Sequence, residues 1–415
     1  MQHRKHKIPL LLKLKRFKNS ADAELLNNFL SMRKPPEKFN GIPERILLIR
    51  NDRIGDAAVT LPVIRDLKLN YPSLVIDVLV SDVNKFVFDE LDYIDNVIEY
   101  NHVPAKLNPF FKIPFLGSVL QFKFYELFPL FYSSARRNEI RYLKNRKYDA
   151  VIDLVGMKRN IFLGKLISKY TAGPRKLGVC ILYNYYIDSN WVSPNDTASM
   201  SLKIERLFVN AFGFSFAKRN TSQPFVSFQI PANSIQKHDV VVHIGTSELR
   251  KLPFETEKKL IAKLSRYRLL ITDSSESERF KELKKEFVHS TNIEFNTFPT
   301  LKELASHCYN AKLLICYDGG QAHYISQFVK TLVIFGPGSV ALWKPNDFSE
   351  YRPLKMFANG VKTEISDGKH KHTVIYFPIW CRPCFDVGCQ ERPCLASIKA
   401  EQIVDLVNNY CLNDD

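Results

Sequence analysis

The residues best placed to do chemistry lie in separate stretches of the chain. The first is RNDRIGDAAVTLP (50–62), in which Asp56 follows an apolar run, ILLI, with Arg50 and Arg53 close by. Gly55 permits a tight turn and the close approach of a ligand. Two interpretations of Asp56 stay open. It caps the helix that follows, where Asp is favoured, or it is a carboxylate placed at the mouth of a cleft to do chemistry.

The second stretch is HIGTSELRKLP (243–253), which also follows an apolar run. Thr246 and Ser247 offer hydroxyl and backbone N–H groups, and Lys251 adds a positive charge. That combination suits phosphate oxygens. The stretch is not a Walker loop, and the dinucleotide fingerprint GxGxxG occurs nowhere in the sequence.

A third stretch, YDGGQAHYIS (317–326), puts Asp318 at the end of a predicted strand. Gly319 and Gly320 open a predicted helix, whose first N–H groups can receive an anion. His323 lies in the first turn of that helix, where a lone histidine is usually structural.

Four cysteines lie close together in WCRPCFDVGCQERPCL, with the spacing CxxC-x4-C-x4-C. They are Cys381, Cys384, Cys389 and Cys394. In the cytosol such a set more often binds metal than forms disulfides. Four thiolates could hold zinc or iron, and the metal would be structural because no position stays open for a substrate. Reduced structural cysteines are the alternative interpretation.

These residues need two similar frameworks to position them. Short apolar runs predict strands at 45–50, 74–80, 97–100 and 148–155. The stretch 57–72 predicts a helix that ends before its last residue, Pro72. The pattern then restarts, with predicted strands at 238–245, 268–273, 311–318 and 331–337, and a helix between the last two. Strands separated by helices indicate βαβ units, so we expect two doubly wound parallel sheets.

The chain length of 415 residues fits two domains. We expect a basic N-terminal extension (1–41), an N-terminal Rossmann-like domain (42–225), a C-terminal Rossmann-like domain with the cysteine set (236–398), and a C-terminal helix (399–415). The N-terminal domain carries a basic, aromatic insertion (101–147). A polar, proline-containing segment (219–237) is the predicted linker.

The net charge of +16 is concentrated in two segments, 1–18 and 101–147, which carry +7 each. Localised basic charge implies an anionic partner, namely a nucleic acid, a membrane surface or a phosphorylated acceptor, unless these segments are only solvated. The aromatic segment 108–137 suits a membrane interface, nucleic-acid stacking or a buried helical hairpin. No apolar run is long enough to span a membrane. We expect no secretory signal at the N-terminus.

Four motifs in order resemble those of glycosyltransferase family nine, the bacterial lipopolysaccharide heptosyltransferases. They are RNDRIGDAAVTLPVIRDLKLNYP, HIGTSELRKLPFE, YDGGQAHYIS and VIFGPGS. The resemblance covers roughly residues 45–410. It implies a GT-B fold of the α/β class, with two Rossmann-like doubly wound domains facing across a cleft. The N-terminal domain would bind the acceptor, and the C-terminal domain would hold the nucleotide sugar.

The resemblance also implies roles for single residues in an inverting heptose transfer from ADP-heptose that needs no catalytic metal. Asp56 would be the general base. The donor would be held by Thr246, Ser247, Lys251, Glu276 (in SSESERF), Asp318, Gly319 and Gly320, with His323 beside them. Many relatives have Ser or Thr where this chain has Gly319, so the donor sugar stays open.

We therefore expect a cytoplasmic enzyme, peripheral on the inner membrane, with ADP-heptose as donor. The acceptor would be an anionic lipopolysaccharide inner core, whose Kdo carboxylates and lipid A phosphates would account for the basic segments. Arg50 and Arg53 would lie near that acceptor. Alternatives are a heptosyltransferase acting on serines of a surface protein, an enzyme using another nucleotide sugar, and a non-catalytic binding relative. A nucleic-acid-binding protein would leave the cleft motifs unexplained, so we expect no nucleic-acid partner.

Overall fold

A computed structural model of the protein describes residues 36–100, 134–174, 183–187, 198–219, 238–345, 350–384 and 389–412. Most of the predicted N-terminal extension and of the basic insertion lie outside the described residues, as does nearly all of the predicted linker. Among the described residues, no helix is long and apolar enough to cross a membrane.

The N-terminal domain is built on six parallel strands in the order β3-β2-β1-β4-β5-β6. The strands are β1 (Arg45–Ile49), β2 (Val75–Val80), β3 (Asn96–Glu99), β4 (Ala150–Asp153), β5 (Tyr170–Pro174) and β6 (Tyr185–Ile187). The helices are α2 (Ile54–Ala58), α3 (Leu61–Asn70), α5 (Ser134–Asn145), α6 (Lys158–Ile167) and α7 (Met200–Phe212), with a 3-10 turn at Lys85–Val87. The apolar run in β1 is buried, as expected for a central strand that is covered on both faces.

The C-terminal domain has eight strands in the order β12-β13-β14-β11-β10-β7-β8-β9. They are β7 (Val240–His243), β8 (Leu269–Asp273), β9 (Ile293–Thr297), β10 (Leu313–Tyr317), β11 (Thr331–Phe335), β12 (Tyr351–Met356), β13 (Lys362–Ser366) and β14 (Thr373–Tyr376). The helices are α8 (Phe254–Leu264), α9 (Glu278–Glu286), α10 (Leu301–Cys308), α11 (Gly320–Tyr324), α12 (Val340–Trp343), α13 (Pro393–Ala396) and α14 (Ala400–Leu406). Single turns lie at Glu248–Arg250, Ile325–Gln327 and Val407–Cys411.

The two sheets share one topology. In the C-terminal sheet, β9-β8-β7-β10-β11-β14 repeats the order of the N-terminal sheet, and β13 and β12 extend its edge in antiparallel pairing. The predicted pair of doubly wound sheets is confirmed. In such sheets ligands bind beyond the carboxyl ends of the strands where the order reverses, which is beside β1 in one domain and β7 in the other.

The predicted single helix over 57–72 is wrong in one respect, because α2 and α3 are separate. Pro62 stands at the start of α3 and has no N–H to continue the hydrogen bonds of α2. The carbonyl oxygens freed at the break are used elsewhere. That of Asp56 accepts from Arg50 Nε and Thr60 Oγ1, both at 2.9 Å, and that of Val59 accepts from Ser201 Oγ at 2.6 Å. The break leaves Asp56 in a short helix of its own.

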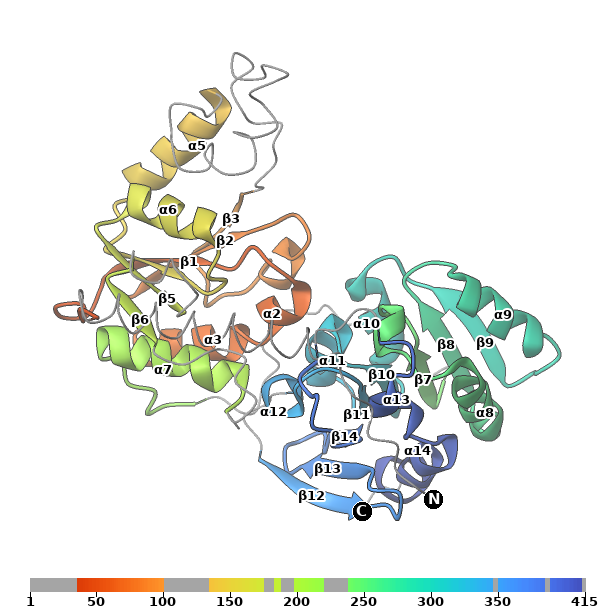
Figure 1. Cartoon of the computed structure of the whole chain (residues 1–415). Helices are drawn as coiled ribbons and strands as arrows, with labels where there is room; N and C mark the ends of the chain where they lie inside the picture. Colours follow the sequence, from red (N-terminus) through yellow and green to blue (C-terminus); the bar gives the residue numbers. More distant parts are fainter. Residues whose placement is uncertain are drawn as a thin grey trace.

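The domains meet where α2 packs against α11 (Figure 1). A Cβ atom on Gly55 would lie 3.4 Å from Gly320 Cα and 3.2 Å from His323 Cδ2. A Cβ on Gly320 would lie 3.2 Å from Ile54 Cβ. Glycine on both sides therefore permits this close approach, and one hydrophobic cluster runs through β1, α2, β10 and α11.

Candidate active site

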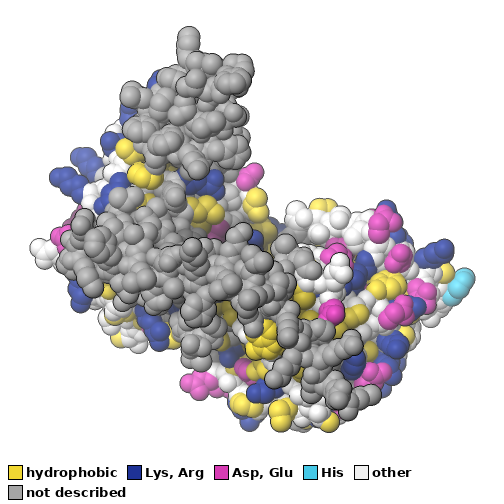
Figure 2. Space-filling model, viewed as in Figure 1, with side chains coloured by type: hydrophobic (Ala, Val, Ile, Leu, Met, Phe, Trp, Pro, Cys, Tyr) yellow, Lys and Arg dark blue, Asp and Glu magenta, His cyan; other side chains and the backbone are white. Residues whose placement is uncertain are grey.

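A cavity of about 770 Å³ lies between the domains, where Figure 2 shows the molecule hollowed. The loop after β1 contributes one wall, and the loops after β7 and β10 contribute the other. The predicted site residues that line it are Arg53, Asp56, Thr246, Ser247, Asp318, Gly319, Gly320, His323 and the four clustered cysteines. Arg50, Lys251 and Glu276 do not line it.

Asp56 is presented to this cavity from the first turn of α2. The residue at the N-cap is Arg53, which makes no side-chain cap hydrogen bond, so the interpretation of Asp56 as the cap is wrong. The Asp56 side chain is 23% exposed, and its Oδ1 lies 4.0 Å from Arg50 Nη2. The carboxylate therefore keeps oxygen atoms free to meet a ligand.

Arg50 has an internal position instead of the expected place near the acceptor. Its side chain is buried, and it donates to the carbonyl oxygens of Asp56 and Leu154 and to Thr60 Oγ1, at 2.8–2.9 Å. These bonds tie the turn before α2 to the end of β4, so Arg50 orients Asp56. Arg53 is exposed and lines the cavity, as its predicted position requires.

A second carboxylate, which the sequence analysis missed, lies behind Asp56. Asp52 accepts from Arg50 Nη1 at 3.3 Å, while its other oxygen is buried without a hydrogen-bond partner among the described residues. Burial raises the pKa of Asp52 to about 6, against the opposing effect of Arg50, and the charge of Asp56 raises it further. RNDRIGD shows both aspartates, but nothing in it tells the buried one from the presented one.

Asp318 faces the cavity from the opposite wall, at the end of β10. Burial raises the pKa of Asp318 to about 6, with Arg250 and Arg382 acting against the shift and Asp56 adding to it. Arg250 Nη1 donates to the Asp318 carbonyl oxygen at 2.9 Å and lies 3.8 Å from the carboxylate. The two domains thus bring two carboxylates and an arginine to one cavity.

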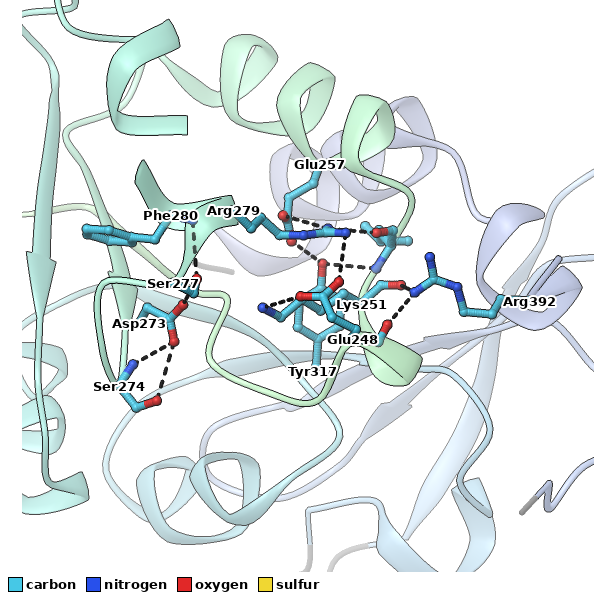
Figure 3. Close-up of polar contacts among 11 residues, drawn as sticks. Glu248, Lys251, Glu257, Asp273, Ser274, Ser277, Arg279, Phe280, Tyr317 and Arg392 are labelled. Atoms are coloured by element: carbon cyan, nitrogen blue, oxygen red, sulfur yellow. Dashed lines mark hydrogen bonds and ion pairs between the residues drawn. The ribbon is translucent and has the colours of Figure 1, made fainter. Parts of the chain in front are cut away.

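The cation that the loop after β7 presents to the cavity is Arg250, not Lys251. Lys251 is only 3% exposed, and its Nζ lies 3.0 Å from Glu248 Oε1 (Figure 3). Lys251 has an extended backbone, in which neighbouring side chains point to opposite sides. The sequence shows both basic residues, and only the backbone conformation decides which one faces the ligand.

A partly buried polar network beside the loop fixes its shape (Figure 3). Arg279 bridges Glu248 and Glu257, at 3.1 Å to each, and Tyr317 donates to Glu257. The Tyr317 hydroxyl also accepts from the backbone N–H of Leu252 at 3.2 Å. Because every charge in this network has a partner of opposite sign, the loop is held without an uncompensated buried charge.

His323 and Gln321 complete the floor of the cavity. His323 is buried, its Nδ1 has no hydrogen-bond partner among the described residues, and burial lowers its pKa to about 4. The imidazole is therefore neutral at neutral pH. Gln321, which the sequence analysis missed, lies beside Gly319, where a Cβ atom would meet its Oε1 at 2.7 Å. A carboxamide thus occupies the space beside Gly319.

Glu276 lies away from the cavity. It is exposed on the loop after β8, 3.9 Å from Lys284 Nζ. The structure therefore does not bring it together with the other predicted donor residues, and its assignment to the ribose stays a prediction.

The four cysteines line one end of the cavity as free thiols. Among the described residues, which include all four, no three Cys, His, Asp or Glu side chains are arranged to hold a metal ion. As placed, the thiols do not fit a tetrahedral site. Arg382, between the first two cysteines, donates to the carbonyl oxygens of Phe335 at 2.9 Å and Gly336 at 3.0 Å. The segment around Arg382 therefore forms the wall of the cavity beside β11.

No family model matches the chain, and no curated protein matches it in sequence. Solved structures do match. A family 9 glycosyl transferase from Veillonella parvula aligns with a TM-score of 0.64 at 16% identity, over 91% of this chain and all of that one. Escherichia coli heptosyltransferase WaaC with ADP gives 0.58 at 16%, over 88% of this chain and 99% of that chain. E. coli ADP-heptose LPS heptosyltransferase II gives 0.58 at 14%, over 88% and 97%.

The chain has the GT-B fold. Its two domains correspond over nearly the whole length of these three enzymes, so the predicted fold is confirmed. The cavity lies beyond the carboxyl ends of β1, β7 and β10, where doubly wound sheets bind ligands. Asp56 and Arg53 lie on the N-terminal side, and Thr246, Ser247 and Arg250 lie on the C-terminal side.

Proposed function

We propose that the protein is an inverting glycosyltransferase that uses a nucleotide sugar. One observation carries this proposal: the Asp56 carboxylate faces Arg250 and Asp318 across a single cavity in a GT-B fold. Sugar transfer needs a base for the acceptor hydroxyl and a stabiliser for the leaving diphosphate, and these two groups come from opposite walls.

Asp56 serves the acceptor. Its carboxylate takes the proton of an acceptor hydroxyl, whose oxygen bonds to the anomeric carbon from the face opposite the diphosphate. The bond from that carbon to the phosphate oxygen breaks as the new bond forms, which inverts the configuration. The proton on Asp56 passes to solvent once the product leaves. Arg50 keeps the turn in place for this step.

The loop after β7 serves the leaving group. Arg250 offers a guanidinium to the diphosphate, and Thr246 and Ser247 offer hydroxyl groups from the same wall. Positive charge aimed at oxygens that gain negative charge lowers the barrier. Because the network beside the loop holds its backbone, these donors need little rearrangement on binding.

For the finer assignment we propose heptose as the sugar, ADP-heptose as the donor and a lipopolysaccharide inner core as the acceptor. The motif resemblance supports it, as do the fold-level likenesses to a heptosyltransferase solved with ADP and to an ADP-heptose LPS heptosyltransferase. We also propose that the enzyme works at the cytoplasmic face of the inner membrane, where such an acceptor is anchored. A structural zinc or iron at the cysteine set stays a prediction, which the metal content of the purified protein tests.

A different nucleotide sugar is the second candidate. Gly319 lacks the hydroxyl found at this position in many relatives, and the Gln321 carboxamide lies beside it instead. A change of polar group on the sugar side of the cavity is a direct way to change which sugar hydroxyls are recognised.

A donor and acceptor screen tests both candidates. The purified chain is incubated with ADP-heptose, other ADP-sugars and UDP-sugars, each with a truncated inner-core acceptor, and release of the nucleoside diphosphate is measured. Acceptor-dependent release of ADP from ADP-heptose is the expected result. Release only from another nucleotide sugar would favour the second candidate, and no release from any pair would overturn the proposed enzyme.

A further inference from the structure

Helix α5 exposes a row of basic side chains at the outer end of the N-terminal domain, beside α6 (Figure 1). Arg137, Arg141 and Lys144 are spaced at i, i+4 and i+7 and share one face of the helix. All three are exposed, as is Lys147 just beyond the helix. The face about 100° around the helix from this row, through Arg136, Ile140 and Leu143, is buried against the domain.

These cations have no acidic partner among the described residues. The only acidic residue in α5, Glu139, pairs with the buried Arg136 at 2.8 Å. Helices α8 and α9 of the other domain differ, because most of their basic residues are paired: Lys258 with Glu255, Lys263 with Glu401, Lys281 with Glu278 and Lys284 with Glu276. The face of α5 therefore carries charge that the described part of its domain does not neutralise.

An exposed aromatic ring lies on the other side of the outward face, about 100° around the helix from Arg141. Tyr142 is 52% exposed, yet its hydroxyl accepts from Arg146 Nη1 at 3.0 Å. Arg146 in turn donates to the buried carboxylate of Asp77 at 2.8 Å. An exposed tyrosine on a helix rich in lysine and arginine suits a membrane–water interface, where tyrosine is enriched.

We propose that the outward face of α5 docks on an anionic lipid bilayer. Basic residues along one side of an amphipathic helix meet lipid phosphates in one plane, and the tyrosine ring enters the headgroup layer. The proposal deepens the proposed function, because an inner-core acceptor is carried on a lipid. The docking proposal rests on the charge and exposure of α5 and not on the cavity.

The test uses the full chain and vesicles of phosphatidylcholine, with or without phosphatidylglycerol, in a flotation assay. The variant is R137E/R141E/K144E, and the control is K259E/K281E/K285E on α8 and α9, with the same change in charge. The variant should bind anionic vesicles at least about 100-fold more weakly, at roughly fivefold per cation removed close to the surface. The control should bind as the wild type does, and Tyr142→Ser should bind a few-fold more weakly.

Equal vesicle binding by the variant and the wild type would overturn the proposal, as would an equal loss in the control. A second arm measures binding to a DNA duplex at the same salt. If the wild type binds DNA more tightly than vesicles, and the α5 variant loses the binding to DNA, this face would be assigned to nucleic acid instead. Circular dichroism and the unfolding midpoint check that the variants fold.

Transfer to a soluble, truncated acceptor separates this proposal from the proposed function. The α5 variant should retain wild-type transfer, because its substitutions lie outside the cavity. If the wild type transfers no sugar, and the α5 variant binds vesicles more weakly than the wild type, the docking proposal stands and the proposed function fails. If transfer works and vesicle binding does not depend on α5, the docking proposal alone fails.

Discussion

The loops that follow β1 and β7 occupy equivalent places in the two domains, and only the first presents a carboxylate to the cavity. After β1, the cation Arg50 is buried in its own domain and the carboxylate of Asp56 is presented. After β7, Lys251 is buried in a network of its own domain and the guanidinium of Arg250 is presented. The shared topology thus places both loops at the cavity, and the side chain that each loop turns toward the cavity decides the chemistry.

Replacing the acid on the N-terminal wall should have the largest effect. Asp56→Asn keeps the shape of the side chain but removes the base, so kcat should fall about 10³-fold while the Kd for ADP stays nearly unchanged. Transfer rates and calorimetric ADP binding measure the two quantities. Asp52→Asn is the matched control and should cost less than tenfold, because Asp52 does not line the cavity. Equal losses in both variants would mean that neither carboxylate acts as a specific base.

The carboxylate on the C-terminal wall should show its burial in the pH dependence of stability. Burial raises the pKa of Asp318 from 3.8 to about 6, so the folded chain holds this proton more tightly than the unfolded chain does. The group therefore favours folding most below pH 4, and that contribution is lost as the pH rises through 6. Asp318→Asn should thus raise the free energy of unfolding at pH 8 by on the order of 2–3 kcal/mol relative to its effect at pH 4.

Denaturant titrations of the wild type and Asp318→Asn at pH 4 and pH 8 measure that difference. The titration of other groups cancels when the two proteins are compared at each pH. A stability difference that does not change with pH would show that Asp318 is not penalised by burial. The carboxylates of the two walls, Asp318 and Asp56, would then differ less in their cost of burial than their structures imply.

The neighbours Arg250 and Lys251 give the sharpest contrast within one loop. Arg250→Met should raise KM for the donor about 10–100-fold, because a charge-assisted contact to the diphosphate is lost. Lys251→Met should leave KM within a few-fold and lower the free energy of unfolding by about 1–2 kcal/mol, because Glu248 loses one partner and keeps Arg279. Initial rates and denaturant unfolding separate the two outcomes. The reverse pattern would place Lys251 at the donor.

The sequence predicts the fold well because the signal is strong. Runs such as ILLI (46–49) and LLIC (313–316) are apolar at every position, which requires strands covered on both faces, and their order with the helices between them indicates doubly wound sheets. The strands β5, β6, β9 and β14, and the antiparallel edge formed by β12 and β13, were not predicted. The strand β12, YRPLKM, contains a proline and charged residues and is partly exposed, so it lacks the apolar run that marks a central strand.

The site is predicted less completely, because side-chain direction depends on local backbone. Asp56, Thr246, Ser247 and Asp318 follow strand ends, and position alone brings them to the cavity. Arg50 and Lys251 also follow strand ends, yet their neighbours in space turn them inward. The partners that do so, Leu154 for Arg50 and Arg279 within the network of Lys251, are distant in sequence. No motif carries that information.

The smallest expected effect concerns Gly319, where the C-terminal wall carries no side chain beside the Gln321 carboxamide. A serine there would place its Cβ 2.7 Å from Gln321 Oε1, at the end of a flexible side chain that can move. Gly319→Ser alone should therefore lower kcat/KM only a few-fold. Adding Gln321→Ala removes the crowding, so the double variant should be about fivefold more active than the two single losses predict. Additive losses in this double-mutant cycle would show that the side chains at 319 and 321 do not interact, and that Gln321 does not replace a hydroxyl at position 319. The two walls would then differ only in the base on one and the phosphate contacts on the other.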